Sequence, residues 1–204
     1  MTPSPITVRP VATSDERMFH LQLADQAFSN KPSENGAQSW GQFITTAPDY
    51  RPEEFRGAFR ADEQMGGYIV YERNLRMGEA RLTTGCISAV VAHPHFRHQG
   101  VATAMMQDAI NYAQTHQHAF LLLDGIPKFY HRYGYTDVFD LSIQLINREA
   151  ILAQPASPYS VRTATVDDAQ AILSLYERQY SAYSGSFTRS LERQEHLLKY
   201  RTAQ

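Results

Sequence analysis

The chain has 204 residues, of which 43% are hydrophobic and 20% charged, a composition typical of a folded globular protein rather than a disordered one. The net charge of −2 and the lack of a lysine- or arginine-rich run argue against a general nucleic-acid-binding protein, because affinity for a phosphate backbone requires clustered cations. The single cysteine, Cys86, excludes an intrachain disulfide and a zinc site of paired cysteines. No apolar run reaches membrane-spanning length and the first residues lack a signal-peptide pattern, so we expect a cytoplasmic protein with no membrane partner.

The first half of the sequence predicts one helix followed by a polar loop and paired strands. Thr13 to Glu16 is a helix start with an acidic first turn. Residues 30–52 are rich in Pro, Ser, Gly and Asn, and we interpret them as a substrate-side loop with a short helix around Trp40–Ile44. The first helix is expected to bury Met18, Phe19, Leu21, Leu23 and Phe28. The expected strands are Thr7–Arg9, Glu54–Arg60, Gly66–Tyr71 and Glu79–Ala92, with turns at Asp62–Gln64 and Asn74–Gly78.

The second half carries the strongest helical pattern of the chain, over Val101–Thr115, where apolar residues recur at helical spacing. The all-apolar run Ala119–Leu123 is typical of a strand buried on both faces. Pro127–Tyr133 is expected to form a short helix that Gly134 ends in a left-handed conformation, and Tyr135–Ile146 a final strand.

After a linker over residues 148–159, the sequence repeats the pattern of its beginning, and we call the two similar segments the first and the second start. Val161-Arg162 followed by T-A-T-V-D-D resembles Val8-Arg9 followed by P-V-A-T-S-D, and each pair precedes an amphipathic helix, here Ala169–Tyr180. About 45 residues cannot bury an independent core. We therefore divide the chain into a domain over 1–147, the linker, and an extension over 160–204. The extension is expected to pack on the first domain, to pack on another subunit, or to begin a truncated second domain.

A loop built to hold an anion lies between the strand that ends at Ala92 and the helix that begins at Val101. It carries Arg97 and Gly100, and the first N–H groups of the following helix lack partners within the helix. A strand, a basic glycine turn and a helix start together can bind a pyrophosphate. The segment therefore predicts a phosphate-bearing cofactor.

Two segments resemble a known family. R-H-Q-G-V-A at Arg97–Ala102 resembles the acetyl-CoA motif of the GNAT superfamily of N-acetyltransferases, R/Q-x-x-G-x-G/A, and F-Y-H-R-Y-G-Y at Phe129–Tyr135 is similar to its F-Y-x-x-x-G-F/Y segment. The resemblance covers about residues 5–147, and the second start resembles the tandem layout of the enhanced-intracellular-survival (Eis-type) acetyltransferases. It implies an α/β fold with a mixed sheet, acetyl-CoA as donor, and direct transfer of the acetyl group to an amine of a small molecule or peptide.

The resemblance also implies roles for individual residues. The loop and helix start would bind the pyrophosphate, and the backbone of Val90, Val91 and Ala92 would pair with the pantetheine arm and donate an N–H to the thioester oxygen. Tyr130 would be the general acid that protonates the leaving thiolate. The expected cofactor-binding residues are Val90, Val91, Ala92, Arg97, His98, Gln99, Gly100, Val101, Ala102 and Thr103.

The general base is left open. Glu79 and His93 lie near the central strand, but a solvated charge and a loop residue are the simpler interpretations. A metal site at His93, His95 and His98 is disfavoured because Pro94 interrupts the loop, so we expect no metal. Trp40, Phe43 and Tyr50 would line the acceptor site.

Two alternatives come from other functional classes. A catalytically inactive acyl-CoA-binding module with the same fold would bind CoA without turning over an amine. A structural subunit would use its extension to form a homo-oligomer and would need no cofactor.

Overall fold

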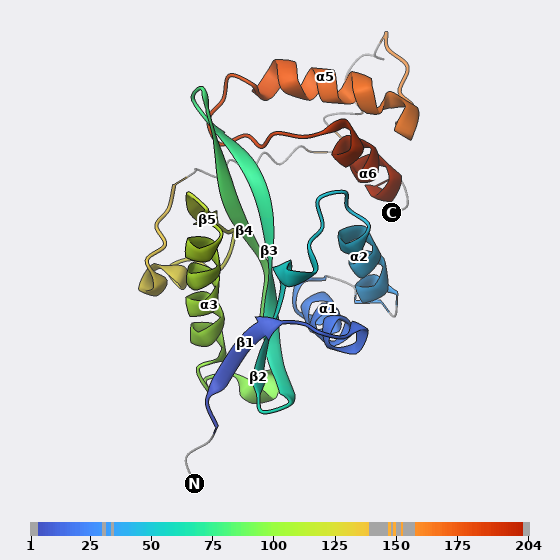
Figure 1. Ribbon diagram of the computed structural model, residues 1–204. Helices are drawn as coiled ribbons and strands as arrows, with labels where there is room; N and C mark the ends of the chain where they lie inside the picture. Colours follow the sequence, from blue (N-terminus) through green and yellow to red (C-terminus); the bar gives the residue numbers. More distant parts are fainter. Residues whose placement is uncertain are drawn as a thin grey trace.

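A computed structural model describes residues 4–29, 32–33, 35–138, 147, 149, 152 and 158–201. In this part of the chain one five-stranded sheet runs in the order β1-β2-β3-β4-β5, antiparallel except for the parallel pair β4–β5. Helices α1 and α2 lie on one face of the sheet and α3 on the other, while α5 and α6 lie beyond one end (Figure 1). The expected mixed α/β fold is confirmed. None of the described helices is long and apolar enough to cross a membrane.

The strands follow the expected order but differ in length. They are β1 (Ile6–Pro10), β2 (Phe55–Arg60), β3 (Glu63–Met77), β4 (Ala80–Ala92) and β5 (Phe120–Leu122). The predicted turn over Asn74–Gly78 is wrong, because β3 continues to Met77 and pairs with Ala80 across a tight turn. The backbone of the end of β3 bonds residues that lie more than 100 positions later in the sequence. The N–H of Thr188 donates to the Asn74 carbonyl at 2.9 Å, and the N–H of Arg76 donates to the Ser186 carbonyl at 2.8 Å.

The helices are α1 (Ser14–Phe28), α2 (Gly36–Thr45), α3 (Val101–Thr115), α5 (Ala169–Tyr180) and α6 (Leu191–Arg201). The bounds of α3 and α5 match the prediction, and Thr13 caps α1 by accepting from the N–H of Glu16 at 3.1 Å. Phe28 was expected to be buried but is 60% exposed, because it lies at the last turn, beyond the sheet contacts of α1. Helix α6 was not predicted.

Two apolar clusters sandwich the sheet. The cluster under α1 and α2 includes Phe55, Ile69 and Val91, and the cluster under α3 includes Met65, Val70 and Met105. The neighbouring residues Ile69 and Val70 of β3 therefore enter opposite clusters, as the two-residue period of a strand requires. Both faces of the central strands are therefore covered.

Two expectations about the chain after α3 need correction or fall outside the described residues. The strand β5 is half-buried rather than fully buried on both faces, because it has only three ladder pairs with β4. Tyr135–Val138 form no strand, and residues 139–146 of the predicted final strand lie outside the described residues. The same holds for most of the predicted linker.

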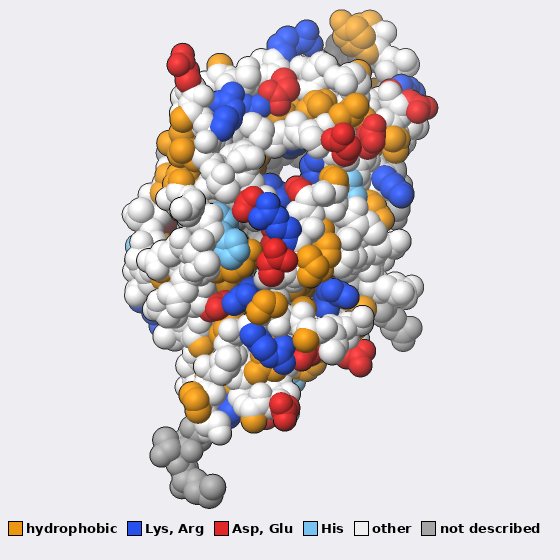
Figure 2. All heavy atoms as spheres, viewed as in Figure 1, with side chains coloured by type: hydrophobic (Ala, Val, Ile, Leu, Met, Phe, Trp, Pro, Cys, Tyr) orange, Lys and Arg blue, Asp and Glu red, His pale blue; other side chains and the backbone are white. Residues whose placement is uncertain are grey.

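The C-terminal extension packs on the preceding part of the chain. From α6, Arg193 pairs with Asp49 at 3.0 Å and the Nε2 atom of His196 lies 2.8 Å from the Phe43 carbonyl oxygen. Near α5, the buried Arg76 of β3 donates to Glu177 and to the Phe187 carbonyl. Figure 2 shows basic and acidic side chains interspersed over the middle of the face it presents.

Candidate functional site

The strands β4 and β5 pair over a short stretch and then part. Their parallel ladder joins Thr84–Cys86 to Phe120–Leu122, and beyond it residues Ile87–Ala92 pair, within the described part of the chain, with β3 alone. Figure 1 shows the short β5 beside the middle of the long β4. Val90, Val91 and Ala92 therefore lie on a stretch of strand edge that could pair with an extended ligand.

A bulge lies within this open stretch. Gly67 pairs with Val91 and Ile69 with Ser88, so Ala89 and Val90 together oppose the single residue Tyr68. Ala89 has a φ of 52°, in the left-handed region that non-glycine residues rarely adopt. The bulge turns the peptide groups of β4 out of the regular ladder at the point where β5 no longer covers it.

The loop before α3 has the backbone of an anion site. His98 and Gly100 have φ values of 62° and 86°, and Gly100 caps α3 without a side-chain hydrogen bond. Because no side chain caps it, the N-terminus of α3 is left open to an anion. Arg97, His98, Gln99 and Gly100 are all exposed.

The first turn of α3 presents one buried and one exposed residue next to this loop. Val101 is buried under the sheet, whereas Thr103 faces solvent beside the second motif. The side chain of Gln99 is occupied within the protein: it accepts from Arg60 at 2.9 Å and donates to the His95 carbonyl at 2.9 Å. Gln99 is thus left with its backbone to offer a ligand, as the sequence interpretation requires.

The two motifs meet in space although about 30 residues separate them. The second forms a 3₁₀ turn over Tyr130–Tyr133 that ends at Gly134 with a φ of 90°, as predicted for this glycine. The hydroxyl oxygens of Thr103 and Tyr133 lie 3.2 Å apart, which ties the turn to the first turn of α3. Ala102 and Tyr130 pack against the same apolar cluster as Val90.

Tyr130 is half-buried among aromatic rings. Its ring centroid lies 4.9 Å from that of Phe129 and 5.9 Å from that of Tyr135. Burial, and then the proximity of Tyr133, raises the pKa of the Tyr130 hydroxyl. The hydroxyl therefore keeps its proton at neutral pH, which is the state that an acid needs.

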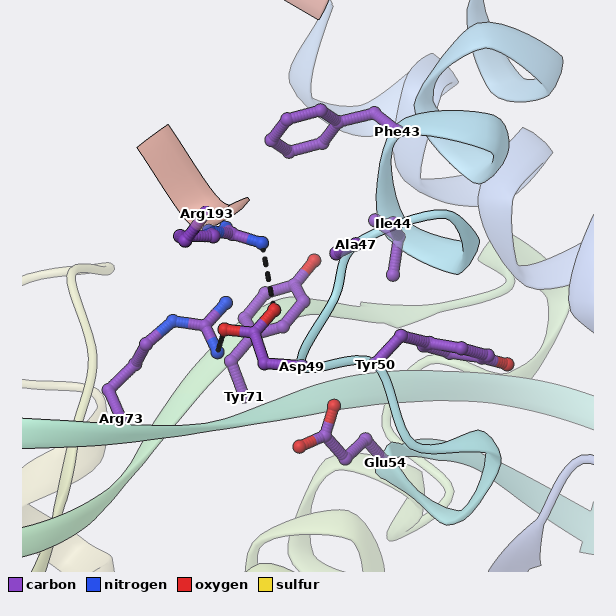
Figure 3. A pocket seen from close by; sticks show the side chains of 9 residues that line it. All are labelled: Phe43, Ile44, Ala47, Asp49, Tyr50, Glu54, Tyr71, Arg73 and Arg193. Carbon is purple, nitrogen blue, oxygen red and sulfur yellow. Dashed lines mark hydrogen bonds and ion pairs between the residues drawn. The ribbon is translucent and has the colours of Figure 1, made fainter. Parts of the chain in front are cut away.

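A small cavity of about 10 Å³, room for about one water molecule, lies between α2, β3 and α6. Figure 3 shows Asp49 between two arginines: its carboxylate bonds Arg73 at 2.9 Å and Arg193 at 3.0 Å. The lining residues are Phe43, Ile44, Ala47, Asp49, Tyr50, Glu54, Tyr71, Arg73 and Arg193. Of the three predicted acceptor-side aromatics, two line this cavity, while Trp40 packs against the cluster under α1 and α2.

Glu54 is the residue of this cavity that sequence reasoning missed. Its side chain is 2% exposed, and one carboxyl oxygen accepts from the N–H of Glu72 at 3.1 Å. Burial raises the pKa of Glu54 to about 7, because its ionised form is poorly solvated there. No local pattern distinguishes Glu54 from the neighbouring Glu53, since the burial comes from packing against distant segments such as β3.

The two base candidates lie apart. Glu79 is exposed in the turn between β3 and β4, and His93 stacks on Phe19 with ring centroids 6.1 Å apart. The ring of His95 lies 4.9 Å from that of His93, and among the described residues no group of three potential metal-ligating side chains comes together. Burial raises the pKa of Cys86 to about 11, which keeps its thiol protonated.

The fold is similar to that of solved acetyltransferases. A GCN5-related N-acetyltransferase from Anabaena variabilis aligns with a TM-score of 0.67 at 15% identity, over 95% of this chain and 48% of that chain. Eis1 from Mycobacterium abscessus aligns with a TM-score of 0.64 at 18% identity, over 98% and 49%. A glucosamine-6-phosphate N-acetyltransferase from Arabidopsis thaliana aligns with a TM-score of 0.52 at 13% identity, over 71% and 100%.

The chain thus spans about half the length of the first two structures, and no curated protein matches it. The model of the acetyltransferase (GNAT) domain family matches residues 7–138, well over half of the sequence. The matched residues include the open edge of β4, the N-terminus of α3, which no side chain caps, and the 3₁₀ turn over Tyr130–Tyr133. The chain therefore belongs to the GNAT acetyltransferase family.

Proposed function

We propose that this protein is an acetyl-CoA-dependent N-acetyltransferase that transfers the acetyl group directly to an amine of a small molecule or peptide. The observation that carries the proposal is the meeting of the two motifs, with the hydroxyls of Thr103 and Tyr133 3.2 Å apart next to the open edge of β4. This arrangement would bring the pyrophosphate site, the strand edge for the pantetheine arm and the tyrosine acid close together.

The residues present fit this donor. The exposed Arg97 and the first N–H groups of α3 would neutralise and bind the pyrophosphate of acetyl-CoA. The backbone of Val90, Val91 and Ala92 would hold the pantetheine arm as an added strand. Acetyl-CoA itself supplies the thioester, and the protein supplies its orientation.

The chemistry requires one bond to form and one to break. The amine, after losing a proton, attacks the thioester carbon, the C–S bond breaks, and the thiolate takes the proton of Tyr130. A backbone N–H of the β4 bulge would stabilise the negative charge that develops on the carbonyl oxygen. The described residues leave the base unassigned, and water is sufficient for an acceptor that is a weakly basic amine.

Two measurements on the full chain test the proposal. Calorimetric titration with acetyl-CoA should show binding, and thiol release should follow when a panel of amines is added. Absence of heat at millimolar acetyl-CoA would overturn the proposal. Binding without thiol release from any amine would support the inactive acyl-CoA-binding module instead.

A pair of tyrosine variants tests the acid. Tyr130→Phe should lower turnover by about 10²-fold, the typical contribution of a general acid, and leave acetyl-CoA affinity unchanged. Tyr135→Phe is the matched control, because it removes a buried hydroxyl that has no partner within the described residues. Equal turnover of the two variants would exclude Tyr130 as the acid.

A further inference from the structure

His20 is a fully buried histidine between α1 and the sheet. The ring is 0% exposed and meets the edge of Phe55 at a centroid distance of 6.1 Å. A Cβ atom at Gly67 would lie 3.2 Å from two ring atoms of His20 and 2.6 Å from the Arg56 carbonyl oxygen. Glycine at position 67 therefore makes the room in the sheet that the imidazole occupies.

The ring makes one hydrogen bond, to the backbone of the β4 bulge. Its Nε2 atom lies 2.9 Å from the Ala89 carbonyl oxygen. Since a carbonyl can only accept, Nε2 must carry the proton. The Nδ1 atom is buried without a partner within the described residues, and burial lowers the pKa of His20 to about 4. The imidazole is therefore neutral at physiological pH, with its proton fixed on Nε2.

This contact sets the direction of one peptide group. The Ala89 carbonyl and the Val90 N–H belong to the same planar trans peptide, so they point in opposite directions. With the carbonyl held towards His20 of α1, the N–H of Val90 points away from α1. Val90 itself packs against the cluster that contains Ala102 and Tyr130.

The bulge alone would not fix the orientation of the Ala89–Val90 peptide group. Ala89 has its φ at 52°, where an alanine is strained, and the bulge interrupts the ladder on the β3 side while β5 has already ended. A strained peptide on an open strand edge can rotate unless a contact fixes it. The hydrogen bond from His20 is the described contact that does so from outside the sheet.

We propose that His20 is a positioning residue that fixes the Ala89–Val90 peptide so that the Val90 N–H donates to the thioester oxygen during acetyl transfer. The inference rests on the proposed function and assigns its oxyanion donor to one peptide. Negative charge develops on the thioester oxygen as the amine attacks, and a donor already aimed at that oxygen needs no reorganisation. His20 forms no bond to the substrate and gains or loses no proton.

Substitutions at position 20 can separate the donor from the bulk of the ring. Gln places an N–H near the position of the imidazole Nε2, Asn reaches only as far as Nδ1, and Met fills the space without a donor. We expect His20→Gln to stay near the wild type, and His20→Met and His20→Asn to lose between about tenfold and 10²-fold in kcat, less than the loss of a whole oxyanion donor. The KM for acetyl-CoA should change little.

A spectroscopic measurement separates positioning from a merely structural role. The infrared stretch of the carbonyl in ¹³C-labelled acetyl-CoA, bound without an amine, should shift to lower frequency in the wild type and His20→Gln. The shift should be smaller in His20→Met and His20→Asn. Free CoA, which lacks the acetyl carbonyl, should bind all four proteins alike. His116→Met is the control, because it removes a histidine whose ring bonds the Tyr112 carbonyl at 2.8 Å on the surface of α3.

The outcomes distinguish this inference from the proposed function. A wild type that does not bind acetyl-CoA would remove both. A wild type that turns over normally, with His20→Met unchanged in kcat and carbonyl frequency, would overturn the inference alone, as would a loss of kcat with an unchanged frequency. If the variants do not fold, ring ¹⁵N shifts of wild-type His20 decide: a proton on Nδ1, or on both nitrogens, at pH 7 would overturn it.

Discussion

The two similar segments of the chain, the first start at Val8 and the second start at Val161, share a local structure and differ in what surrounds it. Arg9 binds the Glu16 carboxylate through two hydrogen bonds of 3.0 and 2.8 Å, and Arg162 binds Asp168 through two of 2.6 Å. In both, a threonine side chain accepts from the backbone N–H three residues later, and the carboxylate accepts from a backbone N–H at or next to that threonine. Thr13 caps α1 itself, whereas Thr165 caps a 3₁₀ turn, Val166–Asp168, that leads into α5. The repeat detected in the sequence is therefore a repeat of a helix start.

The difference lies in the strand. Residues Ile6–Pro10 pair with β2 and join the sheet, whereas Val161 is 94% exposed and its segment forms no strand. Helix α1 buries four residues, while α5 buries Ala169 alone. Local sequence thus suffices to build a capped helix, but a partner strand is needed to turn the same start into part of a core.

Two leucines at matched positions give the largest expected contrast. Leu23 and Leu175 each lie ten residues after the capping threonine, and they are 7% and 54% exposed. Leu23→Ala should lower the free energy of unfolding by about 2–4 kcal/mol, because it removes buried methyl groups and leaves a cavity. Leu175→Ala should cost less than about 0.5 kcal/mol. Urea unfolding of both variants measures the contrast.

Equal losses from the two leucines would contradict the comparison, since they would mean that α5 is as well buried as α1. Leu175→Gln serves as the control for helix propensity, because glutamine and leucine are close on that scale. It should leave the stability near that of the wild type.

The second contrast concerns Glu54, a buried acid that follows the first start. Among the described residues, no buried acid follows the second start. The folded pKa of Glu54 is about 7 against an ordinary value of 4.5, so the unfolded chain releases its proton first as the pH rises. Stability should therefore fall between pH 4.5 and pH 7, by at most about 3 kcal/mol for a shift of this size. Glu54→Gln, which keeps an acceptor for the Glu72 N–H, should be more stable than the wild type at pH 8 and lose this pH dependence.

Urea unfolding at pH 5 and pH 8 gives the measurement, with Glu53→Gln as the partly exposed neighbour for control. The prediction fails if Glu54→Gln and the wild type show the same change in stability between the two pH values.

The third contrast concerns how the second start is held. Arg76 is 2% exposed and donates to Glu177, to the Ser186 hydroxyl and to the Phe187 carbonyl. Arg76→Met should cost about 2 kcal/mol, because the acceptors lose a buried donor while the partly exposed Glu177 can be hydrated. Amide hydrogen exchange should accelerate in α5 and stay unchanged in α3. Arg81→Met is the control, because Arg81 is exposed and donates to carbonyls of its own turn.

The sequence predicts the parts of this fold whose causes are local. The helix over Val101–Thr115 is right to the residue because its period is regular and Gly100 marks its start. The extension of β3 to Met77 could not be predicted, since its edge is completed by residues more than 100 positions later. Helix α6 escaped notice because its apolar residues are few.

The candidate site divides in the same way. The two motifs locate the loop before α3 and the tyrosine turn, and their contact at Thr103 and Tyr133 agrees with the family resemblance. His20 and Glu54 could not be identified from the sequence, because what marks them is burial by residues distant in the chain. Neither the amino-acid composition nor the hydrophobic periodicity of a segment reveals which polar side chain will be buried.

The smallest expected effect tests whether the two caps are equivalent. Thr13→Ala removes the acceptor for the Glu16 N–H and should lower the global free energy of unfolding by about 1 kcal/mol. Thr165→Ala removes the acceptor for the Asp168 N–H in the 3₁₀ turn that leads into α5, but α5 buries Ala169 alone and can open by itself. Its effect should appear as faster amide exchange in α5 with an unchanged urea midpoint. A common midpoint shift for both variants would mean that α5 unfolds together with the sheet, and the second start would then be as much a part of the core as the first.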